Sequence, residues 1–248
     1  MAVYILDNSE ELGEKAADLI AKRLNEAIEK RGQARIILST GASQFETIKY
    51  LVEKNVDWEK VTMFHLDEYL ELPETHKASF RRYLKERFTS KVPVKVHFVN
   101  TEGDVEENLK ELTREIRKDI IDIGVIGIGE NGHIAFNDPP ADFETREAYR
   151  IVALEERCRK QQLNEGWFPT LDEVPFKAAS MTPYQIMQCE TIVSSVPGER
   201  KAEAVRNTLK SEEVTNMVPA TLLKTHKGWH LFLDKESSSL IDSYGCNG

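Results

Sequence analysis

Residues 127–140 bring together side chains that transfer protons and glycines that let a backbone approach a ligand closely. An imidazole can both donate and accept a proton near neutral pH, so His133 is a candidate for proton transfer, and Asp138 follows it within the same short loop. The stretch therefore predicts a proton-transferring loop centred on His133. The alternative is a tight surface turn in which this histidine only satisfies its hydrogen bonds.

The glycines of this loop also match the Gly-x-Gly-x-x-Gly pattern of dinucleotide sites, and a strand-like run at 121–126 precedes them. Such a site needs a helix that begins at the third glycine, so that the helix N-terminus faces the pyrophosphate. Pro139 and Pro140 come before two helical turns could form. We therefore expect no nucleotide cofactor.

Asp67 and Glu68 directly follow an apolar run at 61–66 that is typical of a strand. A carboxylate held at the end of a strand is partly desolvated, which raises its pKa from a reference of ~3.9 and makes it a better base. A helix cap or a surface turn is the alternative. His65 would share a face with Asp67 if the strand continued, but we expect the chain to turn at Asp67.

A loop of small and polar residues joins an apolar strand at 34–38 to a helix, and it contains Thr40, Gly41, Ala42 and Ser43. Backbone N–H groups at a helix N-terminus and hydroxyl groups both donate to anions, so the loop predicts a phosphate cradle. Simple helix capping is the alternative. Lys201 follows a Pro-Gly pair and adds a cation from a neighbouring strand end, unless it is an ordinary solvated charge.

Strands and helices alternate along the chain. Strands are predicted at 3–6, 34–38, 61–66, 94–99, 121–126, 149–154, 191–196 and 229–233, and helices at 9–31, 45–52, 79–88, 105–116, 155–163 and 202–209. This pattern indicates an α/β fold, a single domain over 1–248 with a mainly parallel, Rossmann-like open sheet and helices on both faces. Because ligands bind at the carboxyl ends of such strands, the loops at Thr40, Asp67 and His133 should meet at one edge.

The composition is that of an ordinary globular protein, with 40% hydrophobic and 30% charged residues. A net charge of -9 argues against a nucleic-acid partner, because phosphate backbones need a basic face. Cys158, Cys189 and Cys246 are too few and too scattered for a disulfide framework, and no motif predicts a metal site. No signal peptide or membrane-spanning run is recognisable, so we expect a cytoplasmic protein without a membrane partner.

The chain resembles the glucosamine-6-phosphate deaminase/isomerase family in four segments. The loop at Thr40, the segment 66–69, the stretch 127–139 and the segment 197–202 stand in family order and span nearly the whole chain. The run Gly-His-Ile-Ala-Phe-Asn is specific. The related 6-phosphogluconolactonases share its Gly-His core and usually lack the rest.

The resemblance implies a reaction without metal or redox cofactor, in which an amino-sugar phosphate opens its ring, moves a proton between C2 and C1 and loses ammonia. Asp67 would remove the C2 proton and His133 would relay a proton at the ring oxygen. Asn131 and Asp138 would orient and tune this histidine. The residues that would hold the sugar phosphate are Thr40, Gly41, Ala42, Ser43 and Lys201.

Three positions depart from the family pattern. Asn131 stands where the best-known members have an aspartate, so it cannot favour an imidazolium by charge. Asp138 stands where a glutamate is usual and is one methylene shorter. Gly166 fills the place of a phosphate-binding arginine, for which the candidate substitutes are Arg157, Arg159 and Lys160.

The expected function is therefore amino-sugar-phosphate deamination, with glucosamine 6-phosphate or its galacto epimer as substrate. Hydrolysis of a sugar-phosphate lactone is the first alternative. A sugar-phosphate sensor without turnover is the second, and Asn131 and Gly166 favour it. The sequence leaves the oligomeric state open, including a homo-oligomer.

Overall fold

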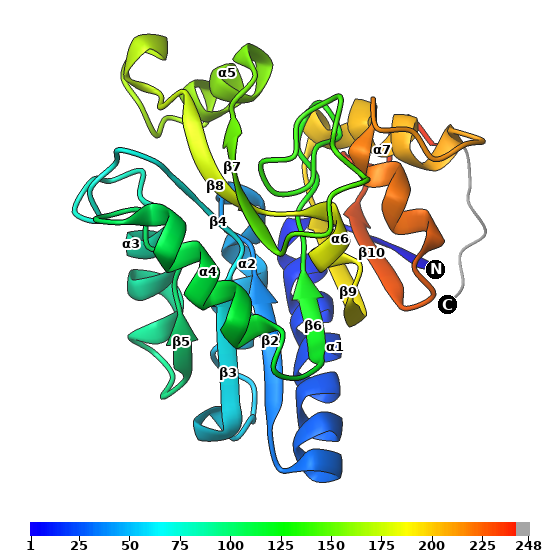
Figure 1. The fold of residues 1–248 in the computed structure, drawn as a ribbon. Helices are drawn as coiled ribbons and strands as arrows, with labels where there is room; N and C mark the ends of the chain where they lie inside the picture. The colour runs from blue at the N-terminus through cyan, green and yellow to red at the C-terminus, as the bar shows by residue number, and fades with distance from the viewer. Residues whose placement is uncertain (242–248) are drawn as a thin grey trace.

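A seven-stranded parallel sheet forms the centre of the computed structural model, which describes residues 1–241 (Figure 1). Its strands lie in the order β1-β10-β9-β6-β2-β3-β5, and each neighbouring pair is parallel. The strands are β1 (Ala2–Leu6), β2 (Ala34–Leu38), β3 (Val61–His65), β5 (Lys95–His97), β6 (Ile121–Val125), β9 (Cys189–Val196) and β10 (Trp229–Asp234).

Helices cover both faces of this sheet, as the alternating pattern predicted. They are α1 (Ser9–Arg31), α2 (Phe45–Leu51), α3 (Phe80–Leu84), α4 (Val105–Ile116), α6 (Pro183–Ile186) and α7 (Ala202–Lys210), whereas α5 (Glu156–Asn164) packs in a separate, smaller cluster. The first helix begins where the Asn8 side chain accepts a hydrogen bond from the Glu11 amide, and it ends at Gly32, whose φ of 76° is left-handed. Both ends match the sequence expectation.

The strands divide their side chains between two apolar cores. On β2, Ile36 and Leu38 pack against α1, α2 and α3, whereas Ile37 points to the opposite face, which α4, α6 and α7 cover. Successive side chains of a strand alternate between faces, so a strand buried on both faces is apolar throughout. This explains the continuous apolar run at residues 36–38 of β2.

A second, three-stranded antiparallel sheet was not predicted. It consists of β4 (Asp67–Tyr69), β8 (Lys177–Met181) and β7 (Tyr149–Ala153), and Asp67 lies opposite Ser180. The chain does leave the main sheet after β3, but Asp67 begins a strand instead of a turn. The strand predicted at 149–154 is β7, but it pairs in this sheet and not in the main one. In β4 three residues are too few to show a period, and the alanines of β8 are weak strand formers, so the sequence carried little signal for these two strands.

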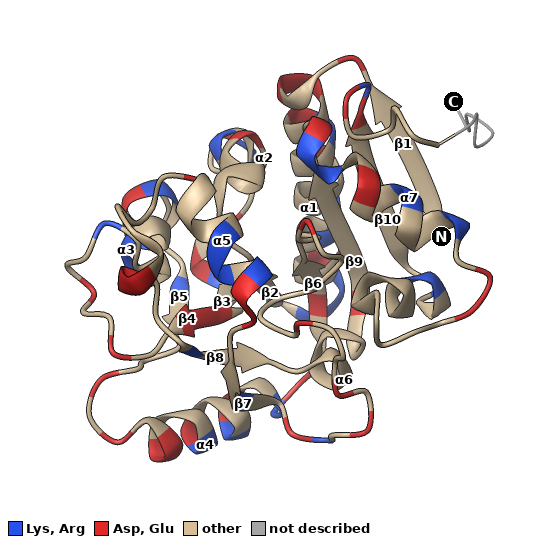
Figure 2. Ribbon diagram, turned by 90° about the horizontal axis from the view of Figure 1, so that it is seen from above, with Lys and Arg blue, Asp and Glu red and all other residues tan. Residues whose placement is uncertain are grey.

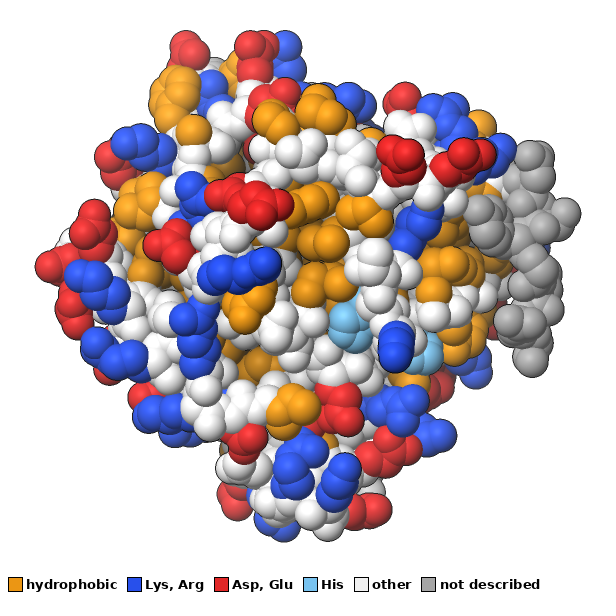
Figure 3. Space-filling model, turned by 45° about the vertical axis from the view of Figure 1, so that its right-hand side comes forward, with side chains coloured by type: hydrophobic (Ala, Val, Ile, Leu, Met, Phe, Trp, Pro, Cys, Tyr) orange, Lys and Arg blue, Asp and Glu red, His pale blue; other side chains and the backbone are white. Residues whose placement is uncertain are grey.

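Other expectations concern the surface and the cysteines. On the face shown in Figure 3, Lys and Arg side chains lie among Asp and Glu side chains. Cys158 and Cys189 are buried free thiols, and Cys246 lies outside the described residues. Among residues 1–241, no helix combines the length and the apolar character that crossing a membrane requires.

Candidate active site

Four adjacent strands deliver the predicted residues to one pocket. Strands β9, β6, β2 and β3 are neighbours in the sheet, and the segments that follow them carry Lys201, His133, the loop at Thr40, and Asp67. The pocket has an empty volume of about 540 Å³, part of it open to solvent. Its lining includes Thr40, Gly41, Ala42, Ser43, Asp67, His133 and Lys201. Asn131 and Asp138 lie behind His133 instead.

His133 is held in place by its own loop. Its amide donates to Oδ1 of Asn131 over 3.1 Å, and its carbonyl accepts from the Gly129 amide over 2.9 Å. A Cβ on Gly129 would lie 2.3 Å from the imidazole, far inside van der Waals contact. Glycine is therefore required at 129 because the histidine ring packs directly on that backbone. In this chain the second glycine of the Gly-x-Gly-x-x-Gly pattern makes room for His133 and not for a dinucleotide.

Asp138 reaches the histidine despite its short side chain. Nδ1 of His133 lies 3.1 Å from Oδ1 of Asp138, and the same oxygen accepts from Nδ2 of Asn131 over 3.1 Å. The other carboxylate oxygen accepts from the Glu155 amide. Burial alone would raise the pKa of Asp138, but His133, Asn131 and the Glu155 amide outweigh it and lower the pKa. Asp138 is therefore ionised and fixes the imidazole.

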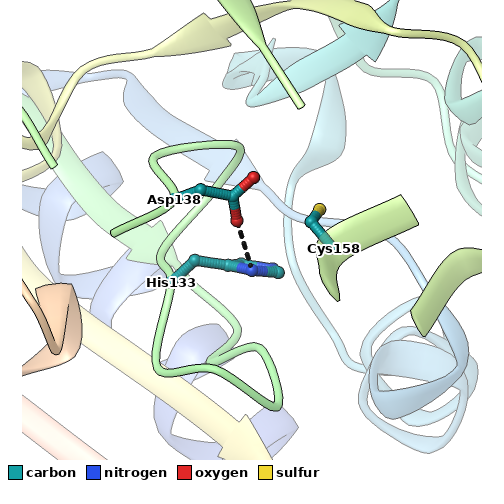
Figure 4. Close-up of side chains that lie close together, drawn as sticks. All are labelled: His133, Asp138 and Cys158. Atoms are coloured by element: carbon teal, nitrogen blue, oxygen red, sulfur yellow. Dashed lines mark ion pairs between the residues drawn. The ribbon is translucent and has the colours of Figure 1, made fainter. Parts of the chain in front are cut away.

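Cys158 of α5 stands beside this pair. Its sulfur, one Asp138 oxygen and a ring nitrogen of His133 lie within 4.8 Å of one another (Figure 4). Burial and the negative charge of Asp138 raise the pKa of the Cys158 thiol well above its usual value. The thiol is therefore neutral and packs against the ion pair.

Asp67 is a buried carboxylate whose charge is poorly compensated. Its side chain is 6% exposed. Burial, with a smaller contribution from the adjacent Glu68, raises its pKa to about 8. This is the direction that the sequence argument anticipated. A carboxylate that titrates near neutrality is suited to take a proton from a weakly acidic carbon.

Glu68 has a structural role that could not be predicted from the sequence. Its fully buried carboxylate accepts hydrogen bonds from the Ser79 hydroxyl and from the Phe80 and Arg81 amides, at 2.8–3.1 Å, and it pairs with the Arg81 guanidinium at 3.3 Å. Burial raises the pKa of Glu68, while these hydrogen bonds act in the opposite direction. The carboxylate thus ties β4 to the start of α3 and holds Asp67 in place.

His65 takes no part in the pocket. It ends β3, is fully buried, and neither ring nitrogen has a hydrogen-bond partner. Burial and the nearby Arg81 charge lower its pKa to about 3, so the ring is neutral. The expectation that it does not pair with Asp67 is confirmed by the separation of the two residues into different sheets.

Two strand ends build the anion-binding side in the same way. Gly41, after β2, and Gly198, after β9, have φ values of 96° and 90°, and each leads into a short 3-10 turn and then a helix. The Gly198 amide donates to the Asp234 carboxylate, and Lys201 closes the turn that follows. Because the first turn of a helix leaves N–H groups unpaired, the junction after β2 presents backbone donors to the pocket, whereas the junction after β9 contributes the Lys201 side chain.

These segments belong to a known family. The sequence model of the family described as glucosamine-6-phosphate isomerases/6-phosphogluconolactonase matches residues 7–232. The chain belongs to this family. The glucosamine-6-phosphate deaminases of Thermoanaerobacter sp. (strain X514) and Halothermothrix orenii are both 34% identical to it over 250 residues. These matches cover 97% of this chain and 95% and 100% of the relatives.

Solved structures of the family share its fold. A monomeric glucosamine-6-phosphate deaminase superposes with a TM-score of 0.88 at 31% identity, over 97% of this chain and 100% of the other. A 6-phosphogluconolactonase from Shewanella baltica OS155 gives a TM-score of 0.77 at 20% identity, over 94% and 97% of the two chains. The second likeness concerns the fold alone.

Helix α5 closes the pocket with residues that the family pattern did not indicate. It lies above the carboxyl ends of β2 and β3 in Figures 1 and 2, and the segment contributes Gln161, Gln162 and Glu165 to the lining. Gln161 accepts from the Glu130 amide, and Gln162 accepts from the Tyr69 hydroxyl. Apolar-polar periodicity could not single out these three, because polar residues on a helix usually face solvent.

None of the cations considered as substitutes for the missing arginine lines the pocket. Arg159 is buried but turned away, since its guanidinium donates to the carbonyls of Leu171 and Val174. Lys160 is exposed and paired with Glu156, and Arg157 is exposed. Lys201 is therefore the one Lys or Arg in the lining formed by the described residues.

Proposed function

We propose that this protein is an amino-sugar-phosphate isomerase/deaminase that converts glucosamine 6-phosphate, or its galacto epimer, to a ketose 6-phosphate and ammonia in the cytoplasm. One observation carries the proposal. A desolvated carboxylate, Asp67, and a carboxylate-bound histidine, His133, line the same pocket as a phosphate-type loop. The names of the full-length relatives support the same chemistry.

The first step is ring opening. His133 gives a proton to the ring oxygen while the C1–O5 bond breaks. The imidazole then takes up the proton that the C1 hydroxyl loses, which leaves an open-chain aldehyde. Asp138 holds the imidazole through Nδ1, so Nε2 is the nitrogen left for the substrate. Asn131 fixes the loop by accepting from the His133 amide and donating to Asp138.

The second step moves a proton from C2 to C1. Asp67 takes the C2 proton, the aldehyde oxygen takes a proton from His133, and the electron pair forms a C1–C2 double bond with a hydroxyl on C1 and the amine on C2. Asp67 then returns its proton to C1, which leaves an iminium at C2. Water adds to this carbon, the nitrogen departs as ammonium, and the ketone forms. No electrons are gained or lost overall.

The distal phosphate would lie at the other end of the pocket. Backbone N–H groups at Gly41, Ala42 and Ser43, the Thr40 and Ser43 hydroxyls and the Lys201 ammonium are the donors in that part of the lining. Binding this end fixes the reacting carbons relative to Asp67 and His133, which is how a remote group accelerates a proton transfer.

The test is ammonia release measured across glucosamine 6-phosphate, galactosamine 6-phosphate and their unphosphorylated forms. Turnover of at least one hexosamine phosphate is expected. Opening of 6-phosphogluconolactone without ammonia release from any hexosamine would replace the proposal with the lactonase function.

A sensor is the second candidate. The described lining of the pocket contains no Lys or Arg besides Lys201, which favours a sensor because turnover needs the substrate held firmly. Sugar-phosphate binding in calorimetry with no product would establish it.

A further inference from the structure

Glu165 places a negative charge where the phosphate end of the substrate is expected. Its carboxylate lines the substrate pocket together with Ser43 and Lys201. It also lines an adjoining, solvent-open hollow that Ala42, Ser43 and Lys201 share. The residue therefore lines both hollows together with the loop at Thr40 and Lys201.

The position of this carboxylate is fixed by two hydrogen bonds. Nε2 of Gln161 donates to Oε1 over 2.8 Å, and Nε1 of Trp167 donates to Oε2 over 3.1 Å. Trp167 packs edge-on against Phe45, the first residue of α2, with ring centroids 6.4 Å apart. These contacts hold the Glu165 carboxylate in a fixed orientation, and each of its oxygens keeps a lone pair that can accept a hydrogen bond from a ligand.

The charges around it oppose a dianion. Lys201 is the single Lys or Arg in the described lining of the pocket, and Arg200 lines only the adjoining hollow. Burial and the Arg200 charge lower the pKa of Lys201, whereas the negative charges of Glu165 and Glu130 act to raise it. A phosphate ester carries about -1.5 to -2 charge at pH 7. In this place it would share one lysine with a fixed carboxylate, and like charges in a partly desolvated pocket repel.

We propose that Glu165 is a specificity-determining residue that weakens the hold on a phosphate dianion, so that the pocket prefers a 6-phosphate over a 6-hydroxyl less strongly than it would without this carboxylate. A hydroxyl donates to the carboxylate and accepts from Lys201, so it satisfies both partners. The reaction named here rests on the proposed function, whereas the charge effect of Glu165 is a property of binding alone.

The test compares the wild type with Glu165→Gln and with Glu156→Gln. The first variant removes the charge and keeps the shape and one acceptor. The second removes a charge from the exposed start of the same helix, away from the pocket, and serves as the matched control. Calorimetry with inorganic phosphate gives Kd, and the ammonia assay gives kcat and KM for glucosamine 6-phosphate and glucosamine.

Glu165→Gln is expected to bind inorganic phosphate about tenfold more tightly than the wild type, which corresponds to about 1.4 kcal/mol. The ratio of kcat/KM for glucosamine 6-phosphate over glucosamine should rise by a similar factor, mainly through KM. Glu156→Gln should change neither quantity by more than about twofold. Equal or weaker phosphate binding by Glu165→Gln would overturn the inference.

A backup variant and the calorimetric measurement allow the inference about Glu165 to be tested even if Glu165→Gln does not fold or the protein has no deaminase activity. If Glu165→Gln does not fold, as judged by circular dichroism, Glu165→Met removes the same charge and takes its place. If the wild type releases ammonia from no hexosamine, the proposed function fails. The calorimetric comparison then still decides the inference about Glu165.

Discussion

At the scale of single residues, the pocket depends on where charge is left uncompensated. Asp138 is ionised because three groups favour its charge, whereas Asp67 has only burial and a neighbouring carboxylate acting on it. Two aspartates of one site therefore have pKa values pushed in opposite directions. Such a division is what separates a residue that orients from a residue that takes a proton.

Asp67→Asn should abolish ammonia release, lowering kcat at least about a thousandfold, because an amide cannot take the C2 proton. In the wild type, kcat/KM should rise with pH and level off above a pKa of about 8, since Asp67 must be ionised to act. Steady-state assays from pH 5 to pH 9.5 measure both effects. Full activity of Asp67→Asn would remove Asp67 from the mechanism.

Gly129→Ala tests whether the position of the His133 ring is critical for activity. The new Cβ would meet the imidazole at 2.3 Å, so the ring must move away from Asp138 or from the pocket. A fall in kcat of about a hundredfold is expected, because misplacement of a reacting group by about 1 Å has costs of this order. A normal kcat, measured in the same ammonia assay, would show that the ring position is not critical.

At the scale of elements, the helices and strands of the first half of the chain were predictable from the sequence. The β4–β8 pairing and the position of α5 over the pocket were not. The alternation of β2, the loop at Thr40 and α2 follows from a continuous apolar run, a glycine and an amphipathic run, all of which are local signals. β4 and β8 pair over more than a hundred residues of sequence, from Asp67 to Ser180. Nothing local specifies that partner, so this pairing and the placement of α5 depended on the tertiary structure.

Glu68→Gln tests the clamp between β4 and α3. It leaves the buried Arg81 guanidinium with less charge compensation, and removing one partner of a buried pair costs about 3–5 kcal/mol. We expect a loss of about 3 kcal/mol in the free energy of unfolding, measured by urea denaturation.

The matched control for this clamp is Glu102→Gln. Glu102 pairs with the same guanidinium at 3.1 Å, but its side chain is 58% exposed. Exposed pairs contribute about 0–1 kcal/mol, so this variant should lose little stability. Equal losses in the two variants would mean that burial of Glu68 is not what makes the clamp strong.

At the scale of the whole molecule, the order of the strands creates the site. The chain builds β2, β3 and β5 outward on one side and then returns to place β6 on the other side of β2. Loops that leave β2 and β6 therefore diverge, and the pocket lies between them, as expected for open parallel sheets. The sequence predicted that these loops would share an edge, because parallel strands all end there. It could not give the neighbour order, since several orders satisfy the same alternation.

Folding the whole chain buries the Asp67 carboxylate, so the proposed catalytic base lowers the stability of the protein at alkaline pH. Its pKa rises from 3.8 to about 8 on folding, and between these values the folded protein keeps a proton that the unfolded chain has lost. Stability from this group is therefore complete below pH 4 and is lost as pH rises through 8.

Asp67→Asn should remove this dependence of stability on pH. At pH 9 the free energy of unfolding of the variant should exceed that of the wild type by on the order of a few kcal/mol. At pH 5 the difference should be much smaller. Urea denaturation at each pH measures this difference. Asp57→Asn, which changes an exposed aspartate, should show no such trend. A constant difference between Asp67→Asn and the wild type across this range would mean that Asp67 is not desolvated in the folded protein.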